Sequence, residues 1–277
     1  KGVLYPAILK EFQKLNSGKY SEAVLTGGIG CGKTTLALYT TIFQVYLLSC
    51  MKCPQSYFGL DPMSEIVFVF QSINAELAKN VDFGRFREMI QNSPYFKDIF
   101  SPISSSEDEI RFPKRIIVRS LTGSPSSALG QNVYGGVVDE VNFMANQLQS
   151  KKSSDGGGFD QAEEIYKSIT QRRKSRFMQG GRLAGILCYV SSKRYTGEFT
   201  ERKIAEAKVQ ASNPTPPANP IYVFDKRPWD VRPKNTFSGK WFHIFCGNMT
   251  RQPRILDDDE VSTTQASDNL VMAIPVE

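Results

Sequence analysis

One octapeptide carries the clearest chemical information in the sequence. It reads Gly27-Gly28-Ile29-Gly30-Cys31-Gly32-Lys33-Thr34, fits the pattern G-x-x-x-x-G-K-S/T and follows the apolar run 23–25. Its glycines let successive backbone N–H groups turn toward phosphate oxygens, while the lysine can reach the β and γ phosphates and the threonine hydroxyl can bind Mg2+. We therefore expect the segment up to Thr35 to bind a nucleoside triphosphate, with Thr34 as a metal ligand.

Two adjacent carboxylates later in the chain are expected to complete this site. Asp139 and Glu140 follow Val137 and Val138, whose side chains are typical of a strand buried on both faces. Asp139 is expected to bind the metal directly or through water, and Glu140 to hold the water that attacks the γ phosphate. Glu140 and Lys33 are therefore the predicted catalytic residues, and the second carboxylate favours hydrolysis over binding alone.

The elements that would position these residues follow from the apolar pattern. Strand-like runs alternate with segments long enough for helices, and this alternation predicts an α/β domain with a mainly parallel central sheet flanked by helices. The expected strands are 24–26, 66–71, 115–120, 134–139 and 184–191, and the expected helices are 33–49, 75–90 and 196–211.

A proline-rich segment suggests where the main domain ends. Residues 213–220 contain four prolines that interrupt regular structure, so we expect an ATPase core over 1–212 and a linker or lid subdomain over 213–277. Two short strands, 221–224 and 241–246, are expected after the boundary. The acidic run 257–260 is expected to form a solvated turn, and the glycine-rich stretch 151–158 a mobile surface loop.

Composition limits the classes of partner and compartment. The net charge is +6 and the pI is near 9.0, which suits a polyanionic partner. The five cysteines are an odd number, and Cys31 lies in the glycine-rich loop, so a reducing cytoplasm is expected. Cys50 and Cys53 form one C-x-x-C pair, but His243 is the only histidine, which argues against zinc. No apolar run reaches the ~20 residues of a membrane helix, so a soluble protein is expected.

Five stretches together resemble the ATPase domain of a tailed-phage large terminase, the motor that moves viral DNA into a capsid. The similarity spans about residues 1 to 210. The stretches are the octapeptide, Tyr57-Phe58-Gly59-Leu60 before the run 66–70, Ser93-Pro94-Tyr95-Phe96, Ser126-Ser127-Ala128-Leu129-Gly130, and the run 191–199 that begins with Ser191-Ser192.

The resemblance implies a RecA-like P-loop fold of the additional-strand type that hydrolyses ATP with Mg2+. Ser191 and Ser192 would sense the γ phosphate and move the helix that follows them. The implied partners are double-stranded DNA, a capsid portal, a small terminase subunit and further copies of the chain in a ring, all within the host cytoplasm. The nuclease domain of that family is not expected in this chain.

The sequence also departs from the terminase pattern. Many relatives carry an arginine at the positions of Ile29 and Leu129, so the cation that stabilises the γ phosphate in the transition state should come from elsewhere. The candidates, in order, are Arg194, Arg172, Arg173 and Arg119, or an arginine from a neighbouring subunit. Two alternatives stay open: a helicase-like ATPase stimulated by DNA, and a nucleotide-gated docking module without hydrolysis.

Contacts with DNA and with the base are less defined by the sequence. The basic run 171–176 is a candidate for sequence-independent phosphate contacts, although a solvated helix face explains it equally well. Lys151 and Lys152 form a second candidate. For the adenine, the N-terminal segment with Tyr5 and Gln13 resembles the base-reading segment of related motors, although packing is the simpler role for Tyr5.

Overall fold

The computed structural model describes most of the chain as an α/β core and a small second sheet. The described residues are 4–73, 78–121, 124, 128, 130–147, 159–193, 197–215, 217–245, 252, 254–257, 259–261 and 271–276. The predicted surface loop at 151–158, with Lys151 and Lys152, lies outside them, and so do Arg194 and Leu129. No helix in the described ranges is both long and apolar enough to span a membrane.

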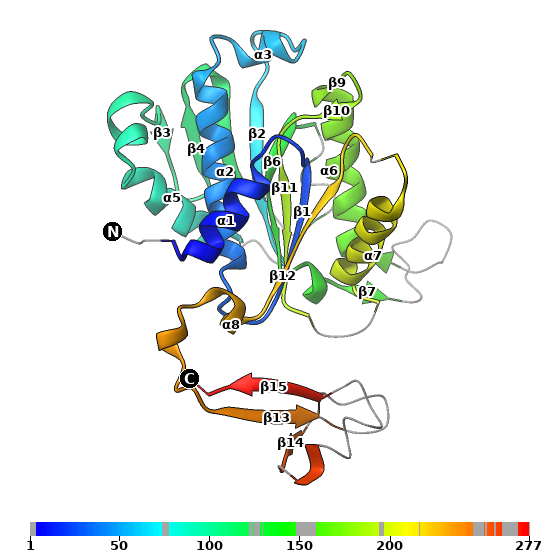
Figure 1. Ribbon diagram of the computed structural model, residues 1–277. Helices are drawn as coiled ribbons and strands as arrows, with labels where there is room; N and C mark the ends of the chain where they lie inside the picture. The colour runs from blue at the N-terminus through cyan, green and yellow to red at the C-terminus, as the bar shows by residue number, and fades with distance from the viewer. Residues whose placement is uncertain are drawn as a thin grey trace.

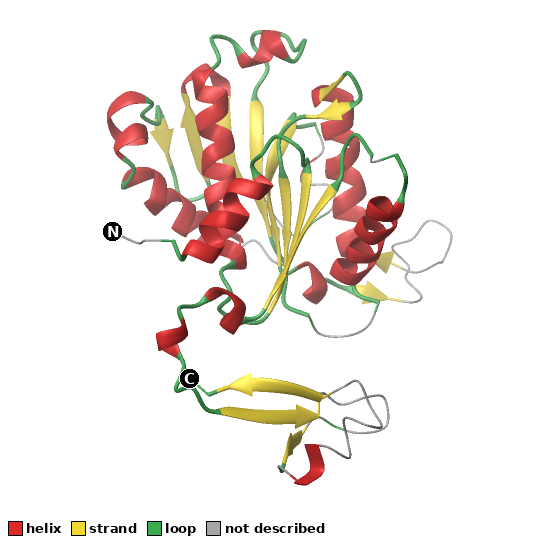
Figure 2. Ribbon diagram, in the orientation of Figure 1, coloured by secondary structure: helices red, strands yellow, loops and turns green. Residues whose placement is uncertain are grey.

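An eight-stranded sheet forms the centre of the core (Figures 1 and 2). Neighbouring strands from β12 to β5 run parallel, and β4 and β3 add an antiparallel edge. β11 lies between β1 and β6, which is the arrangement of the additional-strand P-loop class predicted from the sequence. The order across the sheet is β12 (Ile221–Lys226), β1 (Glu22–Gly27), β11 (Leu187–Val190), β6 (Val133–Asp139), β2 (Ile66–Gln71), β5 (Ile116–Leu121), β4 (Glu109–Phe112) and β3 (Ser104–Ser105).

Helices cover both faces of this sheet (Figure 1). One face carries α1 (Pro6–Leu15), α2 (Lys33–Cys50) and α5 (Gly84–Gln91), and the other carries α6 (Gln161–Phe177) and α7 (Phe199–Ser212). A π-helical turn, η1 (Ala78–Phe83), leads directly into α5. The remaining short helices are α3 (Pro54–Tyr57), η2 (Tyr95–Ile99), η3 (Pro113–Arg115), η5 (Val141–Phe143), α8 (Pro228–Val231) and η6 (Lys234–Thr236).

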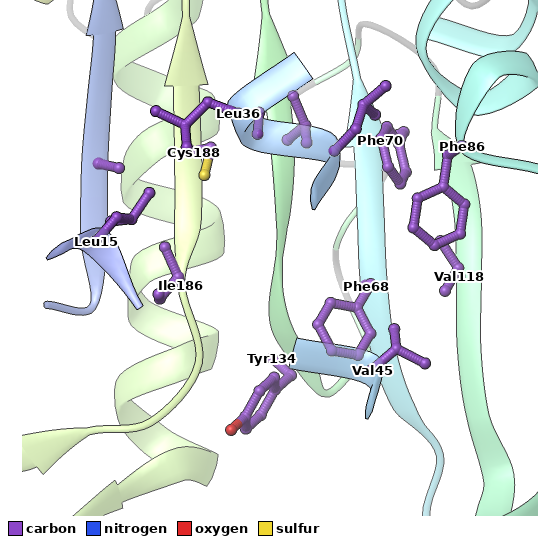
Figure 3. Packing of buried hydrophobic residues seen from close by; sticks show 14 of the residues in the cluster. Leu15, Leu36, Val45, Phe68, Phe70, Phe86, Val118, Tyr134, Ile186 and Cys188 are labelled. Carbon is purple, nitrogen blue, oxygen red and sulfur yellow. The ribbon is translucent and has the colours of Figure 1, made fainter. Parts of the chain in front are cut away.

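The alternation of side chains along β2 explains why both faces are covered. Phe68 and Phe70 pack on the side of α2 and α5, and the Phe70 ring lies 5.1 Å from the ring of Phe86 on α5 (Figure 3). Val67 and Val69 point to the opposite side, where α6 packs. Successive residues of a strand face opposite sides, so an uninterrupted apolar strand has to be buried on both.

Close strand packing at β6 depends on a glycine. Gly136 has a φ of 134°, and a Cβ built there would lie 2.0 Å from the Val69 carbonyl oxygen of β2. No L-residue with a side chain fits such a position without movement of the backbone. This glycine therefore allows β6 to approach β2 just before it delivers Asp139 to the edge of the sheet.

One edge strand of the main sheet comes after the proline-rich segment. β12 begins after the boundary predicted at residue 213, yet it pairs along its length with β1, the strand that precedes the glycine-rich loop. The main sheet therefore continues beyond 213. We propose that the core extends through β12 and that the second unit is the three-stranded antiparallel sheet of β13 (Trp241–Phe245), β14 (Arg254–Leu256) and β15 (Val271–Pro275), which Figure 1 shows beyond α8.

Two short pairings complete the secondary structure of the described residues. β7 (Asn146–Gln147) pairs with β8 (Phe159–Asp160), and β9 (Met178–Gln179) pairs with β10 (Arg182–Leu183). The helix predicted over 33–49 is α2, and the described part of the helix predicted over 196–211 is α7. The strand predicted over 184–191 is shorter, because only Leu187–Val190 pairs with its neighbours.

Candidate nucleotide-binding site

The predicted site residues meet at one edge of the sheet. β1, β6 and β11 are parallel, so their carboxyl ends lie together. β1 ends at Gly27 and continues into the glycine-rich loop, β6 ends at Asp139, and β11 is followed by Ser191 and Ser192. Ligands bind at this edge in open α/β sheets. The topology thus assembles the loop, the carboxylates and the predicted sensor from three separate parts of the chain.

The loop has the backbone shape that the motif predicts. Gly32 is the N-cap of α2 and adopts a left-handed conformation, with φ 84° and ψ 17°. Gly27, Gly28, Gly30 and Gly32 provide the permissive positions, and Cys31 is buried beneath the loop. Ile29 is 84% exposed, so the tip of the loop presents an apolar side chain to solvent. The loop and the first turn of α2, including Thr34 and Thr35, direct backbone N–H groups and a helix N-terminus to one place.

Lys33 links the loop to the predicted sensor. Its ammonium group donates hydrogen bonds to the carbonyl oxygens of Gly27 at 3.2 Å and Gly28 at 2.8 Å. It also donates to the Ser192 hydroxyl at 3.2 Å. The same donors suit phosphate oxygens, so Lys33 and Ser192 lie where a terminal phosphate can contact both.

The two carboxylates differ in burial and in backbone geometry. Asp139 is only 7% exposed, whereas Glu140 is half-buried. Glu140 has a φ of 54°, a left-handed conformation that is uncommon outside glycine and concentrates at functional sites. Its backbone N–H donates to the Asp139 carboxylate at 2.9 Å. Burial raises the pKa of both carboxyl groups, and the negative charge of Asp139 raises the pKa of Glu140 further.

A hydrogen-bond chain runs from Glu140 through the sensor to α7. The Ser191 hydroxyl donates to Glu140 Oε2 at 3.4 Å and accepts the backbone N–H of Asn142 at 3.2 Å. The Asn142 amide donates to the Ser192 carbonyl oxygen at 3.0 Å and to the Thr200 hydroxyl at 2.8 Å. Thr200 lies in the first turn of α7, and its N–H donates back to Asn142 Oδ1 at 3.1 Å. Ser191 and Ser192 are therefore connected to the helix that follows them.

Asp82 is a site residue that the sequence analysis missed. It lies in the η1 turn, is 2% exposed and hydrogen-bonds to Asp139. Burial, together with the charge of Asp139, raises the pKa of Asp82 to about 8. In the sequence, the one sign of its role is that a carboxylate stands between Val81 and Phe83 in the helix predicted over 75–90. π-Helical turns often occur at functional sites, which agrees with this position.

The residues at this edge fit a magnesium ion. Thr34 supplies a hydroxyl and Asp139 a buried carboxylate, both of which are oxygen donors of the kind that Mg2+ prefers. The second oxygen of Asp82, Oδ1, is buried and has no hydrogen-bond partner in the described part of the chain. Such an orphaned oxygen beside Asp139 is consistent with a site that binds a cation or its water ligands. Thr34 and Asp139 are thus the residues that would hold the metal.

Arg173, one of the predicted arginine candidates, does not lie at this edge. Arg173 is fully buried, and its guanidinium donates to the carbonyl oxygens of Tyr134, Ser21 and Gly185 at 3.1, 2.9 and 3.0 Å. These carbonyls are at the beginnings of β6, β1 and β11, the opposite edge from the loop. The predictions that Arg173 contacts nucleotide or DNA are therefore wrong. It looked like a surface residue because its neighbours in the run 171–176 are basic and mostly exposed.

The other described candidates have different surroundings. Arg119 lies in β5 and forms ion pairs with Glu109 at 2.7 Å and with Glu65 at 3.7 Å. Arg172 precedes Arg173 near the end of α6 and is partly exposed. Neither lines a cavity together with the glycine-rich loop.

Two cavities flank the loop. The first, of about 440 Å³, is lined by the loop and the start of α2 together with Leu4, Tyr5, Ile8 and Arg85. The second, of about 570 Å³, is lined by Gly27, Gly28, Ile29, Ser192, Lys193, Asp225, Arg227, Asp230 and Met272. Tyr5, the residue considered for the adenine, thus faces the first cavity, whereas Gln13 is exposed on α1 and does not line it.

The segment after β12 packs closely on the loop. The Gly28 N–H donates to the Lys226 carbonyl oxygen at 3.0 Å. A Cβ built on Gly28 would lie 2.6 Å from Pro228 Cδ, and one built on Gly30 would lie 2.4 Å from Arg232 Nη2. Gly28 is therefore needed for the close approach of Pro228, whereas Gly30 is favoured by its φ of 77°, since the Arg232 guanidinium is the flexible end of a side chain.

Comparison with known families agrees with this geometry. Residues 7–242 match the family described as "Uncharacterized protein MJ0330, N-terminal P-loop domain". The chain belongs to this family. As a P-loop domain with the additional-strand order, it has the fold class predicted from its sequence. No curated protein matches the chain.

One solved structure supports the same fold, and a second is similar at a lower level. The large terminase of bacteriophage HK97 is similar with a TM-score of 0.50 and 14% identity, over 81% of this chain and 39% of the terminase. The predicted resemblance to large terminases is thereby confirmed as a likeness of fold. Pif1 from Bacteroides sp. in complex with ADP-AlF4 is similar with a TM-score of 0.28 and 14% identity, over 82% of this chain and 43% of that one. The chain spans less than half the length of either protein.

Proposed function

We propose that this chain hydrolyses ATP and uses the reaction to move double-stranded DNA, as the ATPase domain of a viral genome-packaging motor. The observation that carries the proposal is the connected set Lys33–Ser192 and Glu140–Ser191, joined through Asn142 to α7. This set supports the proposal because it joins Lys33, Glu140 and α7 in one hydrogen-bonded group. The fold likeness to a large terminase supports the same proposal.

In this mechanism Glu140 accepts a proton from the attacking water and orients it toward the γ phosphate. The burial of Glu140 and the charge of Asp139 raise its pKa, which makes the carboxylate a better proton acceptor. Lys33 leaves the carbonyls of Gly27 and Gly28 and donates to the β and γ phosphates. When bound between Thr34 and Asp139, Mg2+ supplies positive charge that neutralises the phosphates.

The sensor then transmits the loss of the γ phosphate. The Ser192 hydroxyl accepts a hydrogen bond from Lys33 and would donate a hydrogen bond of its own to an oxygen of the γ phosphate, so it loses that acceptor when the phosphate leaves. A change there reaches Asn142 through the Ser192 carbonyl, and reaches α7 through Thr200. Loss of the γ-phosphate contacts would let α7 move, and movement of α7 would alter the contacts between the protein and DNA.

The proposal includes four partners: double-stranded DNA, a capsid portal, a small terminase subunit and further copies of this chain in a ring. The proposed location is the host cytoplasm. The net charge of +6 supports a polyanionic partner. Exposed Lys174 and Arg176 on α6 are the described members of the basic run 171–176 that remain suited to phosphate contacts.

One observation favours a second candidate, a nucleotide-gated docking module without hydrolysis. The cavity beside Ile29 and Ser192 includes Met272 of β15, so the second sheet borders the nucleotide site. Binding of a nucleotide could then reposition that sheet for a partner. The two candidates differ in whether phosphate is released.

The experiment is phosphate release by wild type and by Glu140→Gln, each without DNA, with single-stranded DNA and with duplex DNA. The motor proposal expects release by wild type that duplex DNA stimulates and that Glu140→Gln loses. Equal negligible release in all samples, with nucleotide still bound, would contradict the motor and support the docking module. Equal stimulation by single strands would favour a helicase-like ATPase.

A further inference from the structure

An arginine from outside the glycine-rich loop faces the nucleotide cavity. Arg85 lies in the first turn of α5 and lines the first cavity together with Gly30, Lys33, Thr34 and Thr35. Its Nη2 donates to the Thr35 hydroxyl at 3.4 Å. Besides Lys33, Arg85 is the charged side chain among the described residues that line this cavity.

The linings of the two cavities define its position more closely. Arg85 lines the first cavity with Thr34 and Thr35, whereas Ser192, the predicted sensor, lines the second. Arg85 is therefore on the Thr35 side of the loop.

The negatively charged phosphates of a bound nucleotide would be a ligand for this arginine. A triphosphate with one magnesium ion keeps a net negative charge that Lys33 alone cannot neutralise, and the loop itself presents the apolar Ile29. The hydrogen bond that Arg85 makes in this structure is long, 3.4 Å, and its acceptor is the neutral Thr35 hydroxyl. The Arg85 side chain is exposed. A guanidinium bond to phosphate is shorter, charge-assisted on both sides and roughly twice as strong as a neutral bond.

We propose that Arg85 binds the α and β phosphates, which ATP and ADP share, and so supplies from α5 a cation that the loop lacks. This inference rests on the nucleotide site of the proposed function. It differs from a γ-phosphate arginine in its consequence, because loss of Arg85 should weaken ATP and ADP alike.

The test is calorimetric titration of the whole chain with Mg-ADP, and with Mg-ATP in a Glu140→Gln background that prevents turnover. We expect Arg85→Ala to weaken both nucleotides about tenfold or more, and Arg85→Lys to weaken them less because it keeps the charge. Arg87→Ala is the matched control on the same helix, where the side chain donates to the Ser106 carbonyl oxygen at 3.0 Å. It should bind both nucleotides as wild type does.

Two results would overturn the inference: Arg85→Ala binding both nucleotides as tightly as wild type, or a loss confined to ATP. Thermal melting of each variant checks the fold. If Arg85→Ala melts early, Arg85→Gln, which keeps the length of the side chain, carries the same expectation. Binding is measured separately from turnover, so a wild type that binds nucleotide without releasing phosphate would defeat the proposed function and leave this inference standing.

Discussion

The Lys33 ammonium group donates a 3.2 Å hydrogen bond to the hydroxyl of Ser192, which joins the loop after β1 to the segment after β11. The two residues are far apart in sequence and meet because β1 and β11 are neighbouring parallel strands. The contact joins the predicted sensor hydroxyl to the lysine that we expect to bind phosphate. Its removal should therefore affect turnover more than binding.

Ser192→Ala tests that contact. We expect the rate of ATP hydrolysis to fall about tenfold while ADP affinity stays near that of wild type, because a single hydrogen bond that matters in the transition state is lost. Steady-state phosphate release and calorimetry measure the two quantities. Ser175→Ala, at an exposed position of α6, is the control. An equal loss of ADP affinity would contradict a sensing role for Ser192.

Asn142→Ala should loosen the start of α7 without nucleotide. The substitution removes the amide bonds to Thr200 and to the Ser192 carbonyl but keeps the backbone N–H that donates to Ser191. We expect faster amide hydrogen exchange in the first turn of α7 and a loss of stability of about 1 to 2 kcal/mol. Hydrogen exchange by mass spectrometry measures this, with Asn92→Ala as the control. Unchanged exchange in α7 would show that Asn142 does not connect the sensor to the helix.

Gly136→Ala should destabilise the fold strongly. The added Cβ would lie 2.0 Å from the Val69 carbonyl oxygen, so β6 would have to move away from β2. We expect a loss of about 3 kcal/mol or more in urea unfolding. Gly180→Ala also has a positive φ but meets nothing within 4 Å, and should cost only about 1 to 2 kcal/mol. Similar losses for the two variants would contradict the close approach of β6 and β2.

Asp82 should make stability depend on pH when metal is removed. Its pKa is about 8 in the folded protein against an ordinary value of 3.8, so between these values the folded state holds a proton that the unfolded state has lost. The free energy of unfolding should therefore fall as the pH rises from about 4 to about 8. Urea unfolding at pH 5 and pH 8 in EDTA measures the slope, which should be flatter for Asp82→Asn. An identical slope for wild type and variant would contradict the raised pKa.

Arg173 gives a contrast between a structural and a DNA-binding arginine. Arg173→Ala leaves buried carbonyl oxygens at the beginnings of three strands without their donor, and should cost roughly 3 kcal/mol or more of stability. Lys174→Ala, at the exposed neighbouring position, should leave stability nearly unchanged. A stable Arg173→Ala variant that has lost DNA affinity would contradict the structural role.

The parts of the candidate site that could be predicted from the sequence are those whose residues form a short sequence pattern. The glycine-rich loop, Asp139 and Glu140 form short patterns whose spacing alone describes a phosphate cradle and a strand end. Asp82, Arg85 and Asn142 have no such pattern, because only packing of the η1 turn and α5 on the sheet brings the first two to the loop. Their roles depend on tertiary structure that a single sequence does not encode in any short stretch.

The same reason explains where the fold predictions were incomplete. β12 follows four prolines, which suggested a boundary, but its place is decided by parallel pairing with β1, a contact between distant parts of the chain. Arg173 looked exposed beside other basic residues, yet four backbone carbonyls accept hydrogen bonds from it inside the core. Apolar periodicity predicted most strands and helices, because burial of an element requires apolar residues at regular positions along a short stretch of sequence.

The most direct test of the central claim is ATP hydrolysis by wild type and Glu140→Gln in the presence of duplex DNA, with ATP binding measured on the same samples. The account predicts that Glu140→Gln keeps its ATP affinity and loses about a hundredfold or more of the hydrolysis rate, because only the group that acts on the attacking water is removed. Wild type and Glu140→Gln hydrolysing ATP at the same rate would contradict it.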